Sequence, residues 1–351
     1  MGALKEQHIT IPEGRLAIGN SAYLRNNSLK SVFVPDSVER IGDQAFWQCT
    51  QLEEIRLPMQ LHYLGDGAFD GCISLKSISL GKYLENINCD TFRDCTSLVS
   101  IVLPDDVRSI GTRAFEGCEA LRLDSLPNKL QTIQPGAFSG CHSLESINFP
   151  IQLSSIQEGA FSYCNSLRTI SFSSNLSSIA DGAFSDCKSL TCVTFDSPRI
   201  ALGKNVFHNC PNLSVFEVVS DMLKYEGQKY RTDCLILDGL FYRCCPATAS
   251  ETYIIPEGVA EIQGNAFDGC EKIKKIIVPE GVIAIQTDAF EGCTSLQEIV
   301  LPRSVEIIKR KFLDYHFFYN KGKIFSPDRE HIRGVLPDDM GWEYDQIFQI
   351  D

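Results

Sequence analysis

The chain has 351 residues, of which 44% are hydrophobic and 22% are charged, and its formal net charge is -13 at pH 7. It contains no run of 18 apolar residues, so membrane insertion is not expected. The acidic balance and the lack of a basic stripe argue against nucleic acid as a partner, because phosphates are bound by clustered Lys and Arg.

Residues 1–20 predict an N-terminal cap. Ile9 and Ile11 alternate as in a strand, and Pro12-Glu13-Gly14 supplies a turn. A terminal unit must cover the core and the strand edge that a further neighbour would otherwise cover. The opening residues lack the apolar stretch of a secretory signal, so the sequence as written predicts a cytoplasmic location.

Residues 21–218 and 254–302 repeat with a fixed period. An aromatic residue recurs every 23 positions, and after a break of 60 residues the pattern resumes. The series is Tyr23, Phe46, Phe69, Phe92, Phe115, Phe138, Phe161, Phe184 and Phe207, then Phe267 and Phe290. Such a period indicates a solenoid, because one short unit buries its apolar side chains only by stacking on its neighbours.

One unit, LEEIRLPMQLHYLGDGAFDGC at residues 52–72, shows what each repeat contains. Leu52, Ile55 and Leu57 carry the alternation of a strand, and Pro58 ends it because proline cannot donate to a strand ladder. The Gly-Asp-Gly that follows supplies turn residues. The pattern predicts one short strand in each unit, paired with the next at roughly 4.8 Å.

The pattern LxxIxLPxxLxxIGxxAFxxCxS resembles the leucine-rich repeats of the BspA-like family over nearly the whole chain. The resemblance implies an α/β-type repeat solenoid: curved, right-handed, with a parallel β-sheet on the concave side, mostly β and irregular, with β-hairpin inserts. It also implies a non-enzymatic scaffold whose concave face binds a protein ligand. Many relatives are bacterial surface or secreted proteins, some of them tied to adhesion. The alternative is therefore a secreted or cell-surface adhesin that contacts a host protein or glycan, if a leader was removed.

Fifteen cysteines are present, and ten share one repeat position, three residues after the aromatic. These are Cys49, Cys72, Cys95, Cys118, Cys141, Cys164, Cys187, Cys210, Cys270 and Cys293. Free cysteine is a small, readily buried residue, so we expect reduced packing residues. No CxxC pair indicates zinc. The better candidates for an exposed thiol lie outside this position: Cys89, Cys192, Cys234, Cys244 and Cys245.

Residues 219–253 interrupt the repeat and predict a β-hairpin. Two β-rich runs, 235–237 and 240–242, flank Asp238-Gly239, which is a strong two-residue turn signal. The hairpin either extends the sheet or offers a protruding contact surface, and the sequence leaves both open.

Residues 303–351 abandon the repeat and predict a C-terminal cap. The stretch from Gly322 to Pro337 predicts a second, looser hairpin with Pro327-Asp328 in its turn, and residues 342–351 predict a final strand. An aromatic cluster could add a contact surface here: Phe312, Tyr315, Phe317, Phe318 and Tyr319.

Catalysis is not expected. The six histidines are scattered at positions 8, 62, 142, 208, 316 and 331, without metal-ligand or triad spacing. No nucleophile elbow, phosphate-binding glycine loop or HExxH motif occurs. The sequence therefore predicts neither a cofactor nor a metal.

The candidate binding residues lie at the outward positions of the predicted strands. Phe33 and Arg56 occupy the same position in adjacent repeats and belong to the types enriched at energetic hot spots. The alternative is that Phe33 covers the first coil and Arg56 merely stacks over it. The full candidate set is Phe33, Glu54, Arg56, Tyr63, Ser77, Ser79, Ser100 and Val102.

Overall fold

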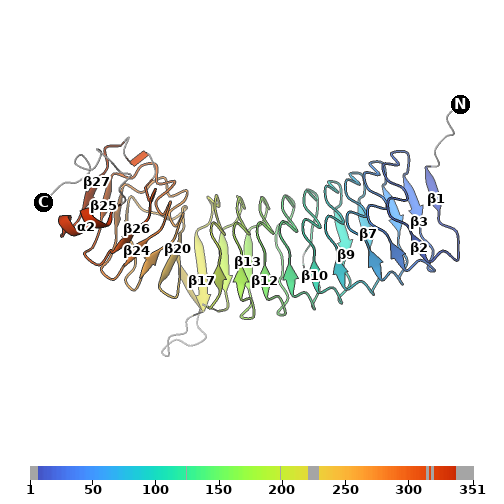
Figure 1. Ribbon diagram of the computed structural model, residues 1–351, viewed down its shortest axis with the longest axis horizontal. Coiled ribbons are helices and arrows are strands. Elements are labelled where there is room, and N and C mark those ends of the chain that lie inside the picture. Colours follow the sequence, from blue (N-terminus) through green and yellow to red (C-terminus); the bar gives the residue numbers. More distant parts are fainter. Residues whose placement is uncertain are drawn as a thin grey trace. The chain divides into compact units, whose positions relative to one another are not determined.

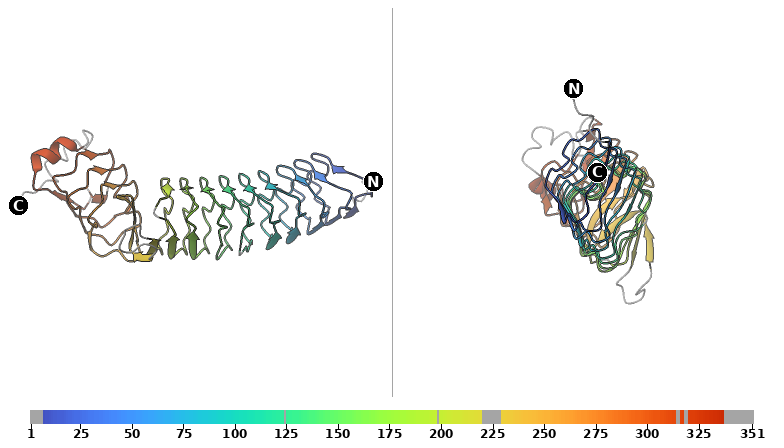
Figure 2. Two further views of the ribbon diagram at one scale, coloured as in Figure 1. Left: turned by 90° about the horizontal axis from the view of Figure 1, so that it is seen from below. Right: turned by 90° about the vertical axis from the view of Figure 1, so that its right-hand side faces the viewer.

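The computed structural model divides the chain into two compact units, residues 1–190 with 200–206 and residues 191–199 with 207–351. Both consist of stacked coils of parallel β-strands, which confirms the solenoid that the 23-residue period predicts (Figures 1 and 2). The residues that the structure describes are 7–123, 125–197, 199–219, 229–313, 316–317 and 320–336. The final strand expected at 342–351 and the aromatic residues Tyr315, Phe318 and Tyr319 lie outside them.

Most coils of the first unit carry two short strands, so the expectation of one strand was wrong. In the coils of Thr132–Ile133 and Ser155–Ile156 the first strand is reduced to isolated bridges, Ser125 with Asn148 and Ser146 with Thr169. The first strands are β1 (His8–Thr10), β3 (Ser31–Phe33), β5 (Glu54–Arg56), β7 (Ser77–Ser79), β9 (Ser100–Val102) and β13 (Thr169–Phe172). The second strands are β2 (Ala17–Ile18), β4 (Arg40–Ile41), β6 (Tyr63–Leu64), β8 (Asn86–Ile87), β10 (Ser109–Ile110), β11 (Thr132–Ile133), β12 (Ser155–Ile156), β14 (Ser178–Ile179) and β16 (Ala201–Leu202). Two residues, one with its side chain outward and one with its side chain inward, are enough to form such a strand, as Tyr63 and Leu64 show. Their backbone pairs with the backbone of the neighbouring coil.

The register between coils of the first unit is constant. Val32 lies beside Ile55, and Ile110 beside Ile133, so every residue stacks on the residue 23 positions away. The same side chain type therefore forms a continuous column inside the unit, while the outward positions form rows on its surface.

A third side of each coil consists of tight turns. Gly67 and Gly71 have φ values of +60° and +72°, the left-handed region that glycine enters without a steric cost. Between these turns the Phe46 N–H donates to the Ala68 carbonyl at 2.8 Å, and the Phe69 N–H to the Thr91 carbonyl at 2.8 Å. The turns thus continue the backbone ladder on the side that has no strands.

The core of the first unit is a stack of aromatic rings, which confirms the inward direction predicted for the repeat aromatic. Phe161 is fully buried between Phe138 and Phe184, with ring centroids 5.1 Å and 5.2 Å away and nearly parallel planes. Phe149 meets the same ring edge-on at 5.5 Å. Burial of these rings contributes to the apolar contact between successive coils, together with buried Leu, Ile and Cys side chains.

The second unit repeats the arrangement with an antiparallel hairpin added. Its strands are β15 (Cys192–Phe195), β17 (Val215–Val219), β18 (Lys229–Thr232), β19 (Cys234–Leu237), β20 (Leu240–Cys244), β21 (Thr252–Ile254), β22 (Glu261–Ile262), β23 (Lys275–Ile277), β24 (Ala284–Ile285), β25 (Glu298–Val300), β26 (Ile307–Ile308) and β27 (Lys323–Phe325). β19 and β20 pair antiparallel, and Asp238 and Gly239 both have positive φ, 49° and 76°. This is the turn that Asp-Gly predicts.

The hairpin is part of the core of the second unit. Phe241 on β20 is fully buried and stacks on Phe267 at 5.1 Å, while β20 pairs parallel with β22. Phe241 therefore restores the aromatic column within the 60-residue break. Of the two interpretations of this hairpin, extension of the sheet or a protruding contact surface, the structure supports the extension of the sheet.

The prediction of a second hairpin from Gly322 to Pro337 was wrong. β27 pairs parallel with β25, and the chain then enters helix α2 (Arg329–Val335). Asp328, which the sequence placed in a hairpin turn, caps this helix by accepting the His331 N–H at 3.0 Å. Phe312 and Phe317 are each 1% exposed, so they are core residues and not the contact surface that the sequence suggested.

Candidate functional site

The outward row at the start of the first unit brings Phe33 and Arg56 together, as the repeat register predicts. The two residues are paired across β3 and β5, and the Arg56 guanidinium carbon lies 4.9 Å from the centre of the Phe33 ring. Arg56 is exposed and Phe33 is half-buried. Glu54 is exposed on the same strand and lies beside Ser31. The three side chains present one apolar surface and both signs of charge.

The other candidate residues are divided between two further places. Ser77 lies beside Ser100, and Ser79 beside Val102, on the exposed face of a separate sheet formed by β7 and β9. Tyr63 lies on β6, in the other set of strands. The structure therefore does not unite all eight candidates on one sheet.

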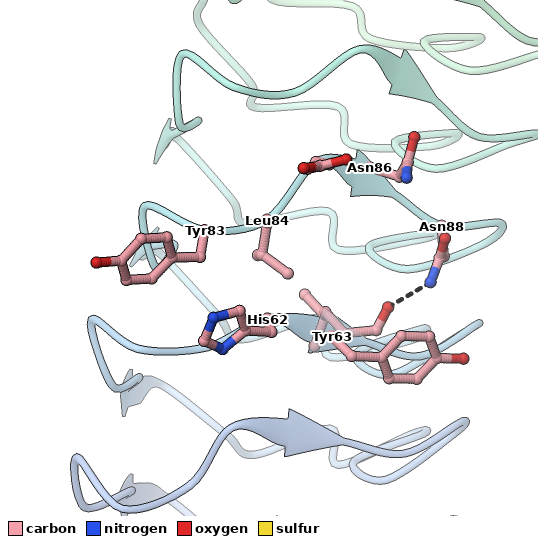
Figure 3. Close-up of a pocket in the computed structure, with 8 residues that line it drawn as sticks. His62, Tyr63, Tyr83, Leu84, Asn86 and Asn88 are labelled. Atoms are coloured by element: carbon pink, nitrogen blue, oxygen red, sulfur yellow. Dashed lines mark hydrogen bonds between the residues drawn. The ribbon is translucent and has the colours of Figure 1, made fainter.

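A pocket of about 320 Å³ lies around Tyr63, in the gap between β6 and β8 (Figure 3). We call it the Tyr63 pocket. Leu64 and Leu84 are its buried apolar residues, and its other walls are aromatic or polar. Its lining is His62, Tyr63, Leu64, Tyr83, Leu84, Glu85, Asn86 and Asn88.

The Tyr63 ring is held from the preceding coil. The Arg40 guanidinium carbon lies 4.3 Å from the ring centre, and the phenol O–H donates to the Asp43 carboxylate at 3.1 Å. Burial raises the pKa of Tyr63, and the hydrogen bond to Asp43 raises it further, so the phenol stays a protonated donor. The ring is therefore fixed in place before any ligand arrives.

A second pair of rings borders the pocket. His62 and Tyr83 stack with centroids 5.0 Å apart and an angle of 3° between their planes. The Lys82 ammonium nitrogen lies 4.7 Å from the centre of the Tyr83 ring. Tyr83 is 40% exposed, so its edge and hydroxyl reach solvent.

The pocket exists because the strand ladder is interrupted there. In the flanking coils the His62 N–H donates to the Glu39 carbonyl, and the Arg108 N–H to the Glu85 carbonyl, each at 2.8 Å. No such bond joins the Glu85 N–H to the His62 carbonyl, although both residues lie in the described part of the chain. The Asn88 side-chain amide instead donates to the Leu64 carbonyl at 2.7 Å.

Sequence reasoning missed this pocket apart from Tyr63, yet two departures from the repeat mark it. Gly81 stands where the two flanking coils have Pro58 and Pro104, and Asn88 stands where they have glycine. The signal is weak on its own, because other coils also replace this glycine. It becomes specific only with the interrupted ladder.

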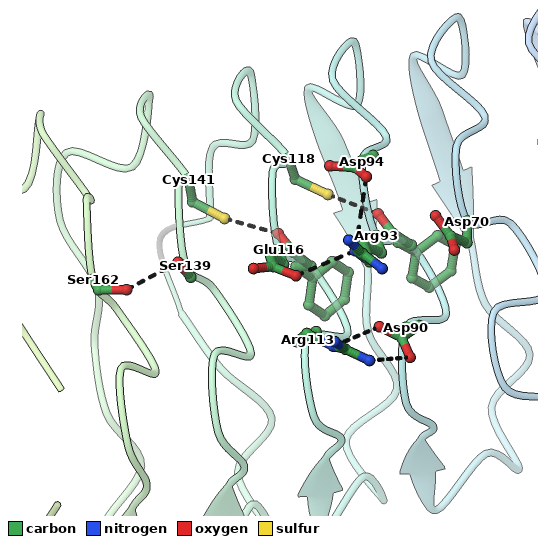
Figure 4. Close-up of polar contacts among 12 residues, drawn as sticks. Asp70, Asp90, Arg93, Asp94, Arg113, Glu116, Cys118, Ser139, Cys141 and Ser162 are labelled. Atoms are coloured by element: carbon green, nitrogen blue, oxygen red, sulfur yellow. Dashed lines mark hydrogen bonds and ion pairs between the residues drawn. The ribbon is translucent and has the colours of Figure 1, made fainter. Parts of the chain in front are cut away.

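The cysteine column is a packing feature, as the repeat predicts. In the first unit each thiol of the column points to the carbonyl oxygen of an aromatic residue in the coil before it, as in Cys118 to Phe92 at 3.1 Å and Cys141 to Phe115 at 3.3 Å (Figure 4). In the second unit Cys210 lies instead 3.6 Å from the His208 carbonyl oxygen. Burial raises the pKa of Cys164 to about 12, so this thiol stays protonated and unreactive.

Three of the five cysteines outside the column are buried as well, so these three are not candidates for an exposed thiol. Cys234, Cys244 and Cys245 lie on or directly after the core strands β19 and β20. Cys89 and Cys192 are half-buried. All fifteen cysteines are free thiols.

Ion pairs lie on the turns of the first unit. The Arg93 Nε lies 3.2 Å from the Glu116 carboxylate, and the Arg113 Nε lies 2.9 Å from that of Asp90 (Figure 4). These side chains are partly exposed, so each pair contributes at most about 1 kcal/mol. They form a charged edge of the unit.

A partly buried polar cluster in the second unit converges on one carboxylate. The Asp268 carboxylate accepts the Asn209 N–H at 2.9 Å and lies 3.1 Å from Arg243 Nη1 and 3.0 Å from His208 Nδ1. Burial alone would raise the pKa of Asp268, but the His208 hydrogen bond and the Arg243 charge outweigh it and lower the pKa below its usual value. The cluster joins segments separated by 59 residues of sequence.

The described part of the chain contains no cluster of three or more His, Cys, Asp and Glu side chains that could hold a metal ion. No helix in the described ranges has the length and apolar character needed to cross a membrane.

Comparison with known proteins identifies the repeat. The family described as "BspA type Leucine rich repeat region" matches in six copies, over residues 3–122, 85–214 and 235–324. A leucine-rich repeat protein from Bacteroides ovatus ATCC 8483 is 22% identical with a TM-score of 0.63, covering 93% of this chain and 94% of that one. A leucine rich cell surface protein from Faecalibacterium prausnitzii A2-165 is 23% identical with a TM-score of 0.54, covering 95% of this chain and 82% of that one. No curated protein matches the sequence.

Proposed function

The chain belongs to the BspA-type leucine-rich repeat family, and from this premise we propose that it binds a protein ligand through the outward face of β3 and β5. The observation that carries the proposal is the adjacent placement of Phe33, Arg56 and Glu54 on one exposed row. An aromatic ring and an arginine bury much area or many donors at once when a partner covers them. The neighbouring serines of β7 and β9 extend the surface with hydroxyl groups.

The test is affinity capture with the full chain, compared between the unmodified protein and the double variant Phe33→Ala with Arg56→Ala. Loss of the same captured protein from the double variant, with an unchanged melting temperature, supports the proposal. Retained capture, or a melting temperature lowered enough to unfold the first unit, shows that the pair only caps the coil by a cation–π contact.

A matched control lies on the second unit. Ile277 and Val300 occupy the same outward strand position on β23 and β25. The double variant Ile277→Ala with Val300→Ala removes half-buried apolar side chains from the equivalent strand position. It should leave capture unchanged if the site lies on β3 and β5.

We also propose that the protein is secreted or lies on the cell surface. Its role there would be adhesion to a host protein or glycan. The support is the shared fold of the F. prausnitzii protein, whose description is a cell surface protein. Protease treatment of intact source cells would release peptides of this chain before lysis. Their appearance only after lysis would contradict the location.

A further inference from the structure

The Tyr63 pocket is separate from the proposed protein-binding row. It lies between β6 and β8, whereas Phe33 and Arg56 lie on β3 and β5, the other set of strands. Its volume of about 320 Å³ is at the lower end of the range for small-molecule sites.

The interrupted ladder leaves backbone groups that a ligand can use. The Glu85 N–H and the His62 carbonyl are the two groups that would bond to each other if the coil followed its neighbours. In the described part of the chain neither has a hydrogen-bond partner. A donor and an acceptor held apart in this way are bridged best by a group that both accepts and donates. A hydroxyl group does both.

The side chains at the pocket add polar groups and an apolar ring face. The same strand position in four successive coils is occupied by Arg40, Tyr63, Asn86 and Ser109. The side chain at this position is much smaller after Tyr63. Arg40 packs on the Tyr63 ring from the preceding coil, so the space beyond Tyr63 lies toward the shorter Asn86. Figure 3 shows Tyr63 and the His62–Tyr83 pair with Asn86 and Asn88 near them.

The charges around the pocket favour a neutral ligand. Glu85 is the carboxylate in its lining. The two cations nearest the rings, Arg40 and Lys82, already lie against Tyr63 and Tyr83. A phosphate or carboxylate would therefore be repelled by Glu85, with no cation placed to bind it. A cationic ligand would be repelled by the two positive side chains, Arg40 and Lys82.

We propose that the Tyr63 pocket binds one or two rings of a neutral carbohydrate. The C–H face of a sugar ring lies on Tyr63, and its hydroxyls bond to Glu85, Asn86 and the backbone groups of the interrupted ladder. Because Arg40 and Asp43 hold Tyr63 in place, binding does not require the aromatic wall to move.

The experiment is saturation-transfer NMR on the full chain with four probes: glucose, galactose, N-acetylglucosamine and lactose. We expect saturable binding of at least one probe, with a dissociation constant in the millimolar range. The variant Asn86→Tyr fills the pocket from an exposed position and should abolish the signal. Tyr63→Ala should weaken binding at least about tenfold by removing the aromatic face on which the sugar ring lies.

The matched control is Ser178→Tyr, which introduces the same side chain at the equivalent first position of β14 and should leave binding unchanged. The proposal is overturned if no probe binds saturably, or if binding survives in Asn86→Tyr with native circular dichroism. Binding of an arginine-containing peptide in place of the sugars, lost in Asn86→Tyr, would assign the pocket to a cation instead. The protein-binding proposal is tested separately, because Phe33→Ala with Arg56→Ala should not affect sugar binding.

Discussion

The Cys141 thiol donates to the carbonyl oxygen of Phe115, 3.3 Å away, in the preceding part of the stack. The same carbonyl also accepts the Cys118 N–H at 3.1 Å. The repeat cysteine is thus both a packing residue and a second donor to a buried carbonyl. This contact recurs along the column, as between Cys118 and Phe92.

Replacing Cys141 with alanine should lower the free energy of unfolding by about 1 to 2 kcal/mol, because a buried sulfur and its contact to the Phe115 carbonyl are lost. Denaturant melting measures the change. The control is Cys89→Ala at a half-buried thiol outside the column, which should cost under about 0.5 kcal/mol. Equal losses at both positions would show that the column contact contributes nothing specific.

Thiol labelling of the native protein should begin at Cys89 and Cys192, the two half-buried cysteines. The other thirteen of the fifteen are buried and should react only after denaturant is added. Mass spectrometry of labelled peptides at short times would check the order. Labelling of Cys234 or Cys245 at the rate of Cys89 would mean that the hairpin opens in the native state.

Phe161→Ala should lower the free energy of unfolding by about 3 to 5 kcal/mol, because it opens a cavity between Phe138 and Phe184. Denaturant melting again gives the value. Ile151 is 59% exposed, so Ile151→Ala serves as a control and should stay within about 0.5 kcal/mol. A loss under about 1 kcal/mol for Phe161→Ala would contradict the role of the ring column.

The period of the sequence was enough to predict the coil stack and its inward ring column. A 23-residue repeat places equivalent residues of successive coils side by side. The neighbours of Phe33 or Phe161 are therefore the residues 23 positions before and after each of them. The second strand of each coil escaped prediction because two residues carry no alternation long enough to recognise. It forms because the neighbouring coil supplies its partner.

The C-terminal region shows where local signals were ambiguous. Pro327-Asp328 suits a turn, but Asp328 is also a good helix cap. Ile332 within α2 and Leu336, its C-cap residue, are both buried. The choice between a turn and a helix depends on what these two side chains pack against. The Tyr63 pocket was hidden for a similar reason, since an interrupted ladder is a relation between coils and not a motif.

The Asp268 cluster should make stability depend on pH. The folded pKa of Asp268 is lowered, so its contribution is present above the ordinary carboxyl pKa of about 4 and is lost as pH falls below that value. Denaturant melting of the full chain between pH 7 and pH 3 would measure this slope. Asp268→Asn should flatten the slope.

At pH 7, Asp268→Asn should also lower the free energy of unfolding by about 3 to 5 kcal/mol, because Arg243, whose side chain is 5% exposed, then lies buried without its counter-ion. The paired replacement Arg243→Met with Asp268→Leu removes both charges and should recover most of that loss. A paired variant no more stable than Asp268→Asn would show that the carboxylate acts mainly through the Asn209 N–H, by holding two distant segments together, and not by neutralising the buried arginine.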